Sequence, residues 1–282
     1  MLTLKAPAKI NWFLHVLSRR DDGYHNILSI MQCIGLYDTL TFEPSAEVSL
    51  DSSLEIPPEE NLVFRAAVLL KEQAGVSRGV HITLVKEIPT GAGLGGGSSD
   101  AASVLTGLNT LWGLHLDSAT LERIGEKLGS DVPFFFHCPA ALVEGRGDRV
   151  TPLHKSVQGY LLLVKPPVHV STKWAYGELS ARGELTRSLK KKDNNILSQE
   201  NSVLEALGIT GSLFRNDFED VMQERFPIIG ELKKQLHEEG AEPALMSGSG
   251  PTLAGYFHER ERALHAMKRF SAHWTKVVPT LV

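Results

Sequence analysis

A glycine-rich segment about a third of the way along the chain constrains its fold most strongly. Residues 89–100 read P-T-G-A-G-L-G-G-G-S-S-D, and five of the chain's 25 glycines lie there within seven residues. A strand-type run, residues 81–88, precedes the segment, and apolar residues at helical spacing follow it over residues 101–112. Glycine lets the backbone approach a ligand, and a helix N-terminus carries partial positive charge. This order therefore predicts a phosphate site, to which Ser98 and Ser99 offer hydroxyls.

The glycine spacing alone leaves the class of phosphate ligand open. Gly91, Gly93 and Gly96 satisfy the G-x-G-x-x-G fingerprint of dinucleotide-binding oxidoreductases, and Asp117 follows about 20 residues later. The P-loop pattern fails, because Gly97 stands where its lysine belongs. The protein-kinase pattern also fails, because a helix and not a strand is predicted after the glycines.

Length and charge exclude several classes of partner. With 282 residues, the chain has room for two domains or one large one. Its 33 acidic and 29 basic residues give a formal net charge of −4, so we expect no nucleic acid partner. The chain contains no uninterrupted apolar run of about 18 residues, so we expect no membrane partner.

Cysteine and histidine usage argues against a protein-built zinc site. Cys33 and Cys138 lie far apart, and the 11 histidines include no H-E-x-x-H pair. We expect each cysteine to be a small buried side chain. Two cysteines are too few for a disulfide framework, which favours a reducing, cytoplasmic setting.

Strand-type and helical segments are mixed along the chain. The predicted strands are residues 2–17, 24–36, 38–43, 81–88, 159–164, 244–246, 252–257 and 276–282. The predicted helices are residues 61–73, 101–112, 118–128, 218–236 with an interruption at Pro227, and 261–270. Residues 45–58 are expected to form a polar connection, and residues 145–152 a turn at a domain boundary. Because regular βαβ alternation is missing, the predicted fold class is α+β.

Three motifs together resemble one enzyme superfamily. They are A-P-A-K-I-N at residues 6–11, the glycine segment, and S-G-S-G-P-T at residues 247–252. In this order they resemble the GHMP kinases, which include galactokinase, homoserine kinase, mevalonate kinase and phosphomevalonate kinase. The resemblance implies ATP and Mg²⁺ as cofactors and a two-domain GHMP kinase fold. Its expected domains are a ribosomal protein S5 domain 2-like N-terminal domain, residues 1–155, and a ferredoxin-like C-terminal domain, residues 156–282.

Three further segments narrow the resemblance. D-G-Y-H at residues 22–25, S-D-V-P-F-F at 130–135 and N-D-F-E at 216–219 resemble the kinases of 4-diphosphocytidyl-2-C-methyl-D-erythritol. The resemblance implies ATP-dependent phosphorylation of that substrate's 2-hydroxyl, in non-mevalonate isoprenoid biosynthesis. It also implies a small-molecule partner, while the sequence leaves monomer and homodimer open. A homoserine or mevalonate kinase is the alternative within the superfamily, and a dinucleotide-dependent oxidoreductase is the alternative from another class.

The resemblance also implies roles for individual residues. Asp131 would be the base that takes the acceptor proton, and Lys9 would hold that carboxylate and offset developing charge. The residues expected to bind ATP are Pro89, Thr90, Gly91, Ala92, Gly93, Leu94, Gly95, Gly96, Gly97, Ser98, Ser99, Asn61 and Lys86. The residues expected to bind substrate are Asn11, Tyr24, His25, Tyr176, Ser249 and Gly250, with the aromatic rings on the cytosine. No residue is nominated as a metal ligand.

Each of these residues also has a plain structural role open to it. Asp131 could cap the helical turn that begins at Val132, and Lys9 could be a lysine on a strand surface. Tyr176 could belong to a core, and residues 249–250 could form an ordinary hairpin turn.

Overall fold

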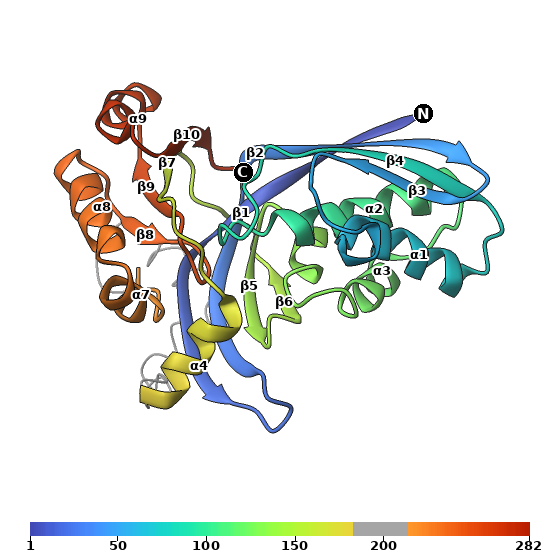
Figure 1. The fold of residues 1–282 in the computed structure, drawn as a ribbon, viewed down its shortest axis with the longest axis horizontal. Coiled ribbons are helices and arrows are strands. Elements are labelled where there is room, and N and C mark those ends of the chain that lie inside the picture. Colours follow the sequence, from blue (N-terminus) through green and yellow to red (C-terminus); the bar gives the residue numbers. More distant parts are fainter. Residues whose placement is uncertain (183–213) are drawn as a thin grey trace. The chain divides into compact units, whose positions relative to one another are not determined.

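The chain forms two compact units that share two long strands. The computed structural model describes residues 1–182 and 214–282 (Figure 1). Unit 1 holds residues 1–9, 36–90 and 95–138, and unit 2 holds residues 10–35, 91–94 and the described part of 139–282. Strands β1 (Leu2–Arg19) and β2 (His25–Ser45) contribute residues to both units, and so does the glycine segment. A boundary between contiguous domains near residue 155 stays a prediction.

Unit 1 is a sheet covered by helices on one face. Strand β3 (Val48–Ser52) pairs in parallel with β4 (Gly79–Val85), and β4 pairs antiparallel with the second half of β2. Figure 1 shows the helices of this unit against these strands. They are α1 (Leu62–Ala74), α2 (Gly96–Trp112) and α3 (Ser118–Gly125), with the 3-10 turns η1 (Pro58–Glu60) and η2 (Pro133–Phe136).

Local sequence explains where these helices begin and end. The side chain of Asn61 accepts a hydrogen bond from the amide of Val63 at the start of α1, and that of Asp117 caps α3 in the same way. Helices α1 and α2 end at Gly75 and Gly113, which have φ angles of 62° and 63°. Such left-handed C-caps favour glycine, because it has no Cβ.

The core of unit 1 forms where the helices meet the sheet. Phe42 of β2 is fully buried in it, together with apolar side chains of β4, α1, α2 and α3. Helix α2 passes close to this ring, since a Cβ on Gly107 would lie 2.9 Å from Phe42 Cε2. Close packing of this kind fixes α2, and with it the glycine segment at its N-terminus, relative to the sheet.

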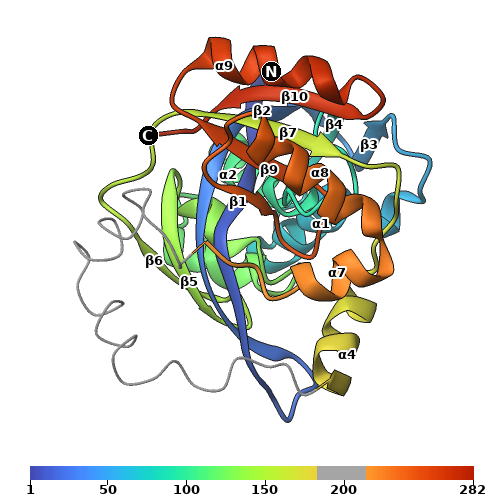
Figure 2. The same ribbon diagram turned by 90° about the vertical axis from the view of Figure 1, so that its left-hand side faces the viewer.

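Unit 2 contains a four-stranded antiparallel sheet. Its order is β10 (Trp274–Pro279), β7 (Tyr160–Lys165), β9 (Leu253–Phe257) and β8 (Ala244–Met246). Helices α8 (Pro227–Glu238) and α9 (Arg260–Met267) pack on it, as Figure 2 shows. The remaining described elements of this unit are α4 (Thr172–Arg182), α7 (Glu219–Arg225), η3 (Lys268–Phe270), β5 (Ala140–Gly145) and β6 (Arg149–Pro152). The first half of β2 pairs with β5, and β5 pairs with β6.

Two strand predictions are wrong in instructive ways. The separate strands expected at 24–36 and 38–43 are one strand, β2, which continues through Gly35. This glycine serves a close approach and not a turn, because a Cβ there would lie 2.7 Å from Pro279 Cγ. The expected connection at 45–58 contains strand β3, which is short and half polar. Its apolar residues, Val48 and Leu50, are only partly buried, and this explains why the pattern is weak.

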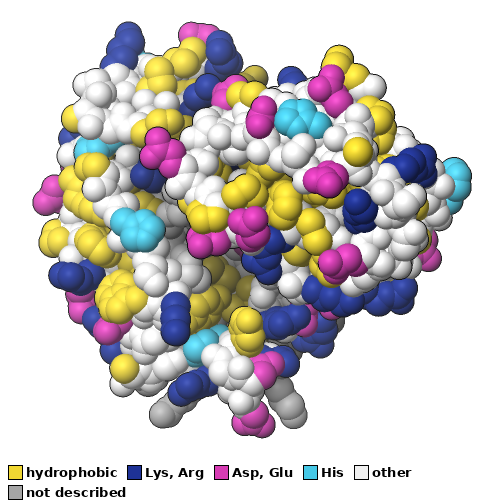
Figure 3. Space-filling view, turned by 45° about the vertical axis from the view of Figure 1, so that its right-hand side comes forward, with side chains coloured by type: hydrophobic (Ala, Val, Ile, Leu, Met, Phe, Trp, Pro, Cys, Tyr) yellow, Lys and Arg dark blue, Asp and Glu magenta, His cyan; other side chains and the backbone are white. Residues whose placement is uncertain are grey.

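The surface, the helices and the cysteines bear on the expectations about nucleic acid, membranes and a reducing setting. On the face drawn in Figure 3, lysine and arginine side chains have acidic side chains among them, in keeping with the small net charge. None of the helices within residues 1–182 and 214–282 has the length and apolar character needed to cross a membrane. Cys33 is fully buried as predicted, but Cys138 is exposed, so the prediction that both cysteines are buried is wrong for Cys138. The described residues include no free cysteine. The cysteines therefore do not support the reducing setting that their small number suggests.

Truncating Phe42 tests the core of unit 1. Phe42→Ala removes a fully buried ring and leaves a cavity beneath α2, so we expect the free energy of unfolding to fall by about 3–5 kcal/mol. Val85→Ala is the matched control, because Val85 at the end of β4 is 54% exposed and should change stability by less than about 0.5 kcal/mol. Urea titrations of both variants measure the difference, and equal losses would contradict this account of the core.

Candidate functional site

The loop before α2 alternates glycines with buried apolar side chains. Gly91, Gly93 and Gly95 have φ angles of 61°, 77° and 71°, in the left-handed region that other residues disfavour. Ala92 and Leu94, which lie between them, are 2% and 1% exposed. The loop therefore needs glycine at every second position, while the two apolar side chains anchor it. Turns of this kind bring successive N–H groups into the concave arrangement that binds anions.

Helix α2 begins with a glycine and not with a capping side chain. Its N-cap is Gly95, which offers no side-chain acceptor, and the helix starts at Gly96. The helix thus begins five residues before the predicted start at residue 101, so Ser98, Ser99 and Asp100 lie within it. The first N–H groups of a helix have no intrahelical acceptor, so this end of α2 keeps donors for an anion. Gly96 is needed as well, because a Cβ there would lie 2.9 Å from Ile88 Cγ2.

Within unit 2, the loop contacts the second glycine motif. Ser247 Oγ donates a hydrogen bond of 2.9 Å to the carbonyl oxygen of Gly93. A Cβ on Gly93 would lie 2.1 Å from the carbonyl oxygen of Ser247, so only glycine fits there. Two asparagines hold the other side of this motif. Asn216 Nδ2 donates to the carbonyl oxygen of Met246 at 2.7 Å, and the amide of Gly248 donates to Asn11 Oδ1 at 2.9 Å.

A buried lysine faces a carboxylate within unit 1. Lys9 Nζ lies 3.7 Å from Asp131 Oδ2, and the side chains are 3% and 35% exposed respectively. Burial lowers the pKa of Lys9, and the charge of Asp131 partly opposes this shift. Gly95 makes room for the lysine, because a Cβ on Gly95 would lie 2.9 Å from Lys9 Cγ. The ammonium is thus enclosed, while the carboxylate remains open to a ligand.

A second buried lysine connects the two ends of the glycine loop. Lys86 follows β4 directly, and its ammonium donates to Asp38 Oδ2 and, at 2.8 Å, to Asp100 Oδ2. The other oxygen of Asp38 accepts the amides of Glu87 and Ile88 at 2.7 and 2.9 Å. Asp38 therefore holds the end of β4 before the loop, and Asp100 lies in α2 after it.

This cluster has one lysine for two carboxyl groups. Asp38 and Asp100 are 0% and 2% exposed. Burial, followed by the charge of Asp38, raises the pKa of Asp100 to about 7, against the opposing effect of Lys86. Asp100 Oδ1 and the neighbouring Ser99 Oγ are buried without a hydrogen-bond partner. The Asp100 carboxyl can therefore carry a proton at neutral pH, which removes the excess negative charge.

The aromatic residues of the second predicted site lie in unit 2. The rings of His25 and Tyr176 stack, with centroids 4.9 Å apart and an interplanar angle of 21°. His25 Nε2 lies 2.6 Å from Ser180 Oγ in the same helix as Tyr176. Tyr24 is 52% exposed, and the guanidinium of Arg146 lies 5.5 Å from the centroid of its ring. Exposed and stacked rings of this kind can cover the face of a planar base.

Comparison with known proteins decides the family. The model of the GHMP kinases N terminal domain matches residues 61–138, and that of the GHMP kinases C terminal region matches residues 188–276. The chain is 48% identical over 282 residues to the 4-diphosphocytidyl-2-C-methyl-D-erythritol kinase of Thermodesulfovibrio yellowstonii, covering 100% of this chain and 99% of that one. It is 42% identical over 268 residues to the enzyme of the same name from Pelobacter propionicus, covering 93% and 91% of the two chains.

The chain belongs to the 4-diphosphocytidyl-2-C-methyl-D-erythritol kinase family of the GHMP kinases. A solved structure of a 4-(cytidine 5'-diphospho)-2C-methyl-D-erythritol kinase superposes with a TM-score of 0.84 at 33% identity and covers 99% of both chains. A homoserine kinase from Cytophaga hutchinsonii reaches 0.68 at 20% identity, covers 100% of this chain and 94% of that one, and shows the shared fold alone. The predicted two-domain α+β GHMP kinase fold is thereby confirmed, and the oxidoreductase alternative is excluded.

The structure brings together several of the residues that the sequence predicts to form the site. Lys9 meets Asp131, the glycine loop meets the motif at 247–250, and His25 meets Tyr176. Ser249 Oγ lies 2.9 Å from Thr172 Oγ1, and Gly250 has a φ angle of 85°. Asp131 does not cap η2, because the N-cap of this 3-10 turn is Val132. The ligands that these residues bind stay predictions.

Sequence reasoning missed the partners of the predicted residues. Asp38 and Asp100 carry the bonds of Lys86, which the sequence assigns only to ATP. The sequence signal for Asp38 is that it is a lone acidic residue in a strand-type run, among apolar residues that are expected to be buried. Asn216 lies in the N-D-F-E segment, which was noted as a family motif without a role. Ser180 carries no sequence signal.

The described residues offer no protein-built metal site. No group of three or more His, Cys, Asp or Glu side chains in residues 1–182 and 214–282 could hold a metal ion. Mg²⁺ can be held mainly by phosphate oxygens and water, so ATP can bring it without such a group.

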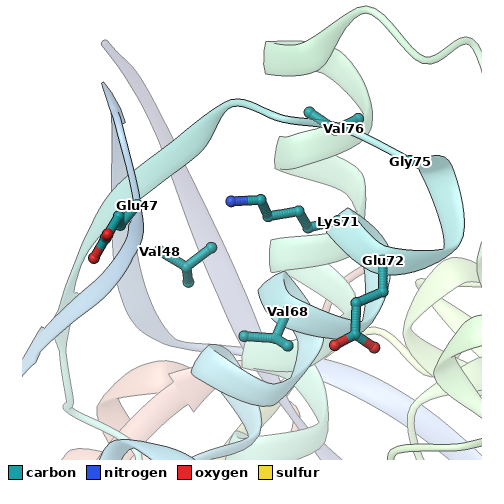
Figure 4. Close-up of a pocket in the computed structure, with 7 residues that line it drawn as sticks. All are labelled: Glu47, Val48, Val68, Lys71, Glu72, Gly75 and Val76. Carbon is teal, nitrogen blue, oxygen red and sulfur yellow. The ribbon is translucent and has the colours of Figure 1, made fainter.

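Unit 1 also has an open pocket away from these residues. Its volume is about 570 Å³, and Figure 4 shows its lining from β3 and α1, with Lys71 extending toward Val48. None of the residues predicted to bind ATP or substrate lines it. The pocket therefore takes no part in the site.

Replacing Asp100 by asparagine tests its raised pKa. The pKa of the Asp100 carboxyl is about 7 in the folded state and about 4 in the unfolded state. Its contribution to the free energy of unfolding therefore falls as pH rises between these two values. We expect the unfolding free energy of Asp100→Asn, relative to the parent chain, to rise by on the order of 2–3 kcal/mol between pH 5 and pH 7.5. Urea titrations at both pH values measure this change.

Asp117→Asn is the matched control. The hydrogen bond from Thr120 lowers the pKa of Asp117, so this carboxyl does not titrate between pH 5 and pH 7.5. Its difference from the parent chain should stay constant over that range. A constant difference for Asp100→Asn as well would contradict the raised pKa.

Proposed function

We propose that this chain transfers the γ-phosphoryl group of ATP to the 2-hydroxyl of 4-diphosphocytidyl-2-C-methyl-D-erythritol, a step of non-mevalonate isoprenoid precursor biosynthesis. The observation that carries this assignment is the 48% identity over 282 residues with a kinase of that name. The products are the 2-phosphate of the substrate and ADP. The hydroxyl oxygen bonds to the γ-phosphorus while the bond from this phosphorus to the β–γ bridging oxygen breaks.

The nucleotide part of the proposal rests on the loop before α2. Left-handed glycines and an N-cap without a side chain give N–H donors and a partial positive charge for the phosphates. Asn61 and Lys86 remain proposed contacts of the nucleoside end. Mg²⁺ would accompany the phosphates and neutralise their charge, and we assign it no protein ligand.

Asp131 and Lys9 carry the chemical step in this proposal. The partly exposed carboxylate of Asp131 accepts the proton that the hydroxyl loses, and the enclosed ammonium of Lys9 orients that carboxylate. The ammonium also stabilises negative charge that develops on the attacking oxygen. Because Lys9 is buried, its charge acts across less water than a surface lysine's would.

The cytidine end of the substrate is assigned to unit 2. Tyr24, His25 and Tyr176 offer ring faces and a ring nitrogen, which suit stacking on a cytosine and reading its hydrogen-bonding edge. Asn11, Ser249 and Gly250 complete the proposed substrate contacts. A cytoplasmic location and a monomeric or homodimeric state also belong to the proposal.

A panel of acceptors tests the substrate. Coupled ADP release with ATP–Mg²⁺ should show turnover with 4-diphosphocytidyl-2-C-methyl-D-erythritol and none above background with homoserine or mevalonate, because the latter two lack a base for the rings to cover. Phosphorus and proton NMR of the product should place the new phosphate on the 2-hydroxyl. Turnover with homoserine or mevalonate alone would overturn the assignment.

Replacing Asp131 tests the catalytic base. Asp131→Ala removes the proton acceptor, so kcat should fall by about two to four powers of ten while the fold persists. Because the Asp131 side chain is 35% exposed, its truncation leaves no cavity in the core, and the fold should persist. Asp117→Asn serves as the control with an unchanged rate. A rate for Asp131→Ala within about tenfold of the parent enzyme would remove the assignment.

A further inference from the structure

The cluster of Asp38, Lys86 and Asp100 lies at the base of the glycine loop. Lys86 is the first residue after β4, and Asp100 is the fifth residue of α2. The bonds from the Lys86 ammonium to Asp38 and Asp100 therefore join the segment that enters the loop to the helix that leaves it. The ammonium also lies beneath the start of α2, since a Cβ on Gly96 would be 3.1 Å from Lys86 Nζ.

The net charge of this cluster depends on one proton. With both carboxyl groups ionised, the cluster has a net charge of −1, and with Asp100 protonated it is neutral. The Asp38 and Asp100 carboxyl groups are both buried and share the Lys86 ammonium, so the negative charge of Asp38 favours the protonated form of Asp100. Asp100 Oδ1 is buried without a partner, so the ionised form has no second group to stabilise it there.

Few other charges face Asp100. It is the one ionisable residue in the sequence of α2, which spans Gly96–Trp112. The buried residues of α1, α3 and η2, which pack against α2, are apolar or glycine. Lys86 and Asp38 are the charged groups that act on it, and Lys9, beside Gly95, is the next cation along the loop. The protonation of Asp100 therefore sets the charge beneath the first turn of α2.

We propose that Asp100 is a positioning residue for the nucleotide. When its carboxyl is protonated, Asp100 keeps Lys86 bonded across the base of the loop without excess negative charge. When the carboxyl is ionised, its negative charge weakens phosphate binding. The proposal rests on the proposed function, because it needs ATP phosphates at the start of α2. A phosphate there adds negative charge near Asp100, and nearby negative charge favours the neutral carboxyl. Binding of ATP and protonation of Asp100 therefore support each other.

The direction of the pH effect follows from this coupling. The pKa of Asp100 is raised to about 7, so the carboxyl is mostly protonated at pH 6 and mostly ionised at pH 8.5. ATP prefers the protonated form, so its affinity should fall as pH rises through 7. Thermodynamic linkage also requires the protein to take up protons when ATP binds near pH 7.5.

Isothermal titration of the full chain with ATP–Mg²⁺ tests the proposal. We expect the ratio of the Kd at pH 8.5 to the Kd at pH 6 to be about tenfold larger for the parent chain than for Asp100→Asn. Ionisation of ATP itself cancels from this comparison, because it affects both proteins equally. Asp117→Asn, which removes an exposed carboxylate from the same unit, should keep the ratio of the parent chain. Equal ratios for the parent chain and Asp100→Asn would overturn the proposal.

A second measurement needs no variant. Titrations of the parent chain at pH 7.5 in two buffers of different ionisation enthalpy give the number of protons exchanged on binding. We expect uptake of about half a proton by Asp100, because the phosphates of ATP–Mg²⁺ are already almost fully ionised at this pH. Zero uptake or net release would overturn the proposal. Failure of the proposed function looks different, because it would appear as no ATP binding or turnover at any pH.

Discussion

Two positions of the glycine loop, Gly93 and Gly95, must lack a side chain because other groups of the protein pack directly against their backbone. At Gly93, a Cβ would overlap the carbonyl oxygen of Ser247, and at Gly95 it would press on the side chain of Lys9. Both residues also have left-handed φ angles. The loop can therefore approach the second glycine motif within unit 2 and the buried Lys9 within unit 1 only as bare backbone. The proposed phosphate site depends on the same condition, because it would use backbone N–H groups.

Burial gives the two lysines of unit 1 different tasks. Lys9 faces one carboxylate that is 35% exposed, so its pair remains open to a ligand. Lys86 faces two carboxyl groups that are almost completely buried, so its cluster is closed to water. A buried cluster with a net charge is energetically costly unless it binds a proton, whereas a group in an exposed ion pair can exchange its partner for a ligand. The same residue type thus forms an open ion pair in one place and a closed cluster at the base of the glycine loop in the other.

The sequence predicted motifs and local elements better than it predicted partners. Glycine at every second position, a strand before it and a helix after it were recognisable from Gly91 to Trp112, because these patterns are local. The continuous strand β2 was not, because the reason for Gly35 is Pro279, which is distant in sequence. Asp38 was missed for the same reason, since its bonds to Lys86 and to the amides of residues 87 and 88 exist only after β2 pairs with β4.

The shared fold explains phosphoryl transfer but not the choice of acceptor. A homoserine kinase and mevalonate kinases superpose on this chain with TM-scores of 0.65–0.68 at 13–20% identity, so the fold serves several acceptors. Selectivity must therefore come from side chains that the fold does not dictate. In the proposed site the stack of His25 on Tyr176 and the exposed ring of Tyr24 would be such side chains, and small aliphatic acceptors would give them nothing to cover. On the proposed assignment, catalysis and selectivity depend on different residues, so one kinase fold could change acceptors while the glycine loop stays the same.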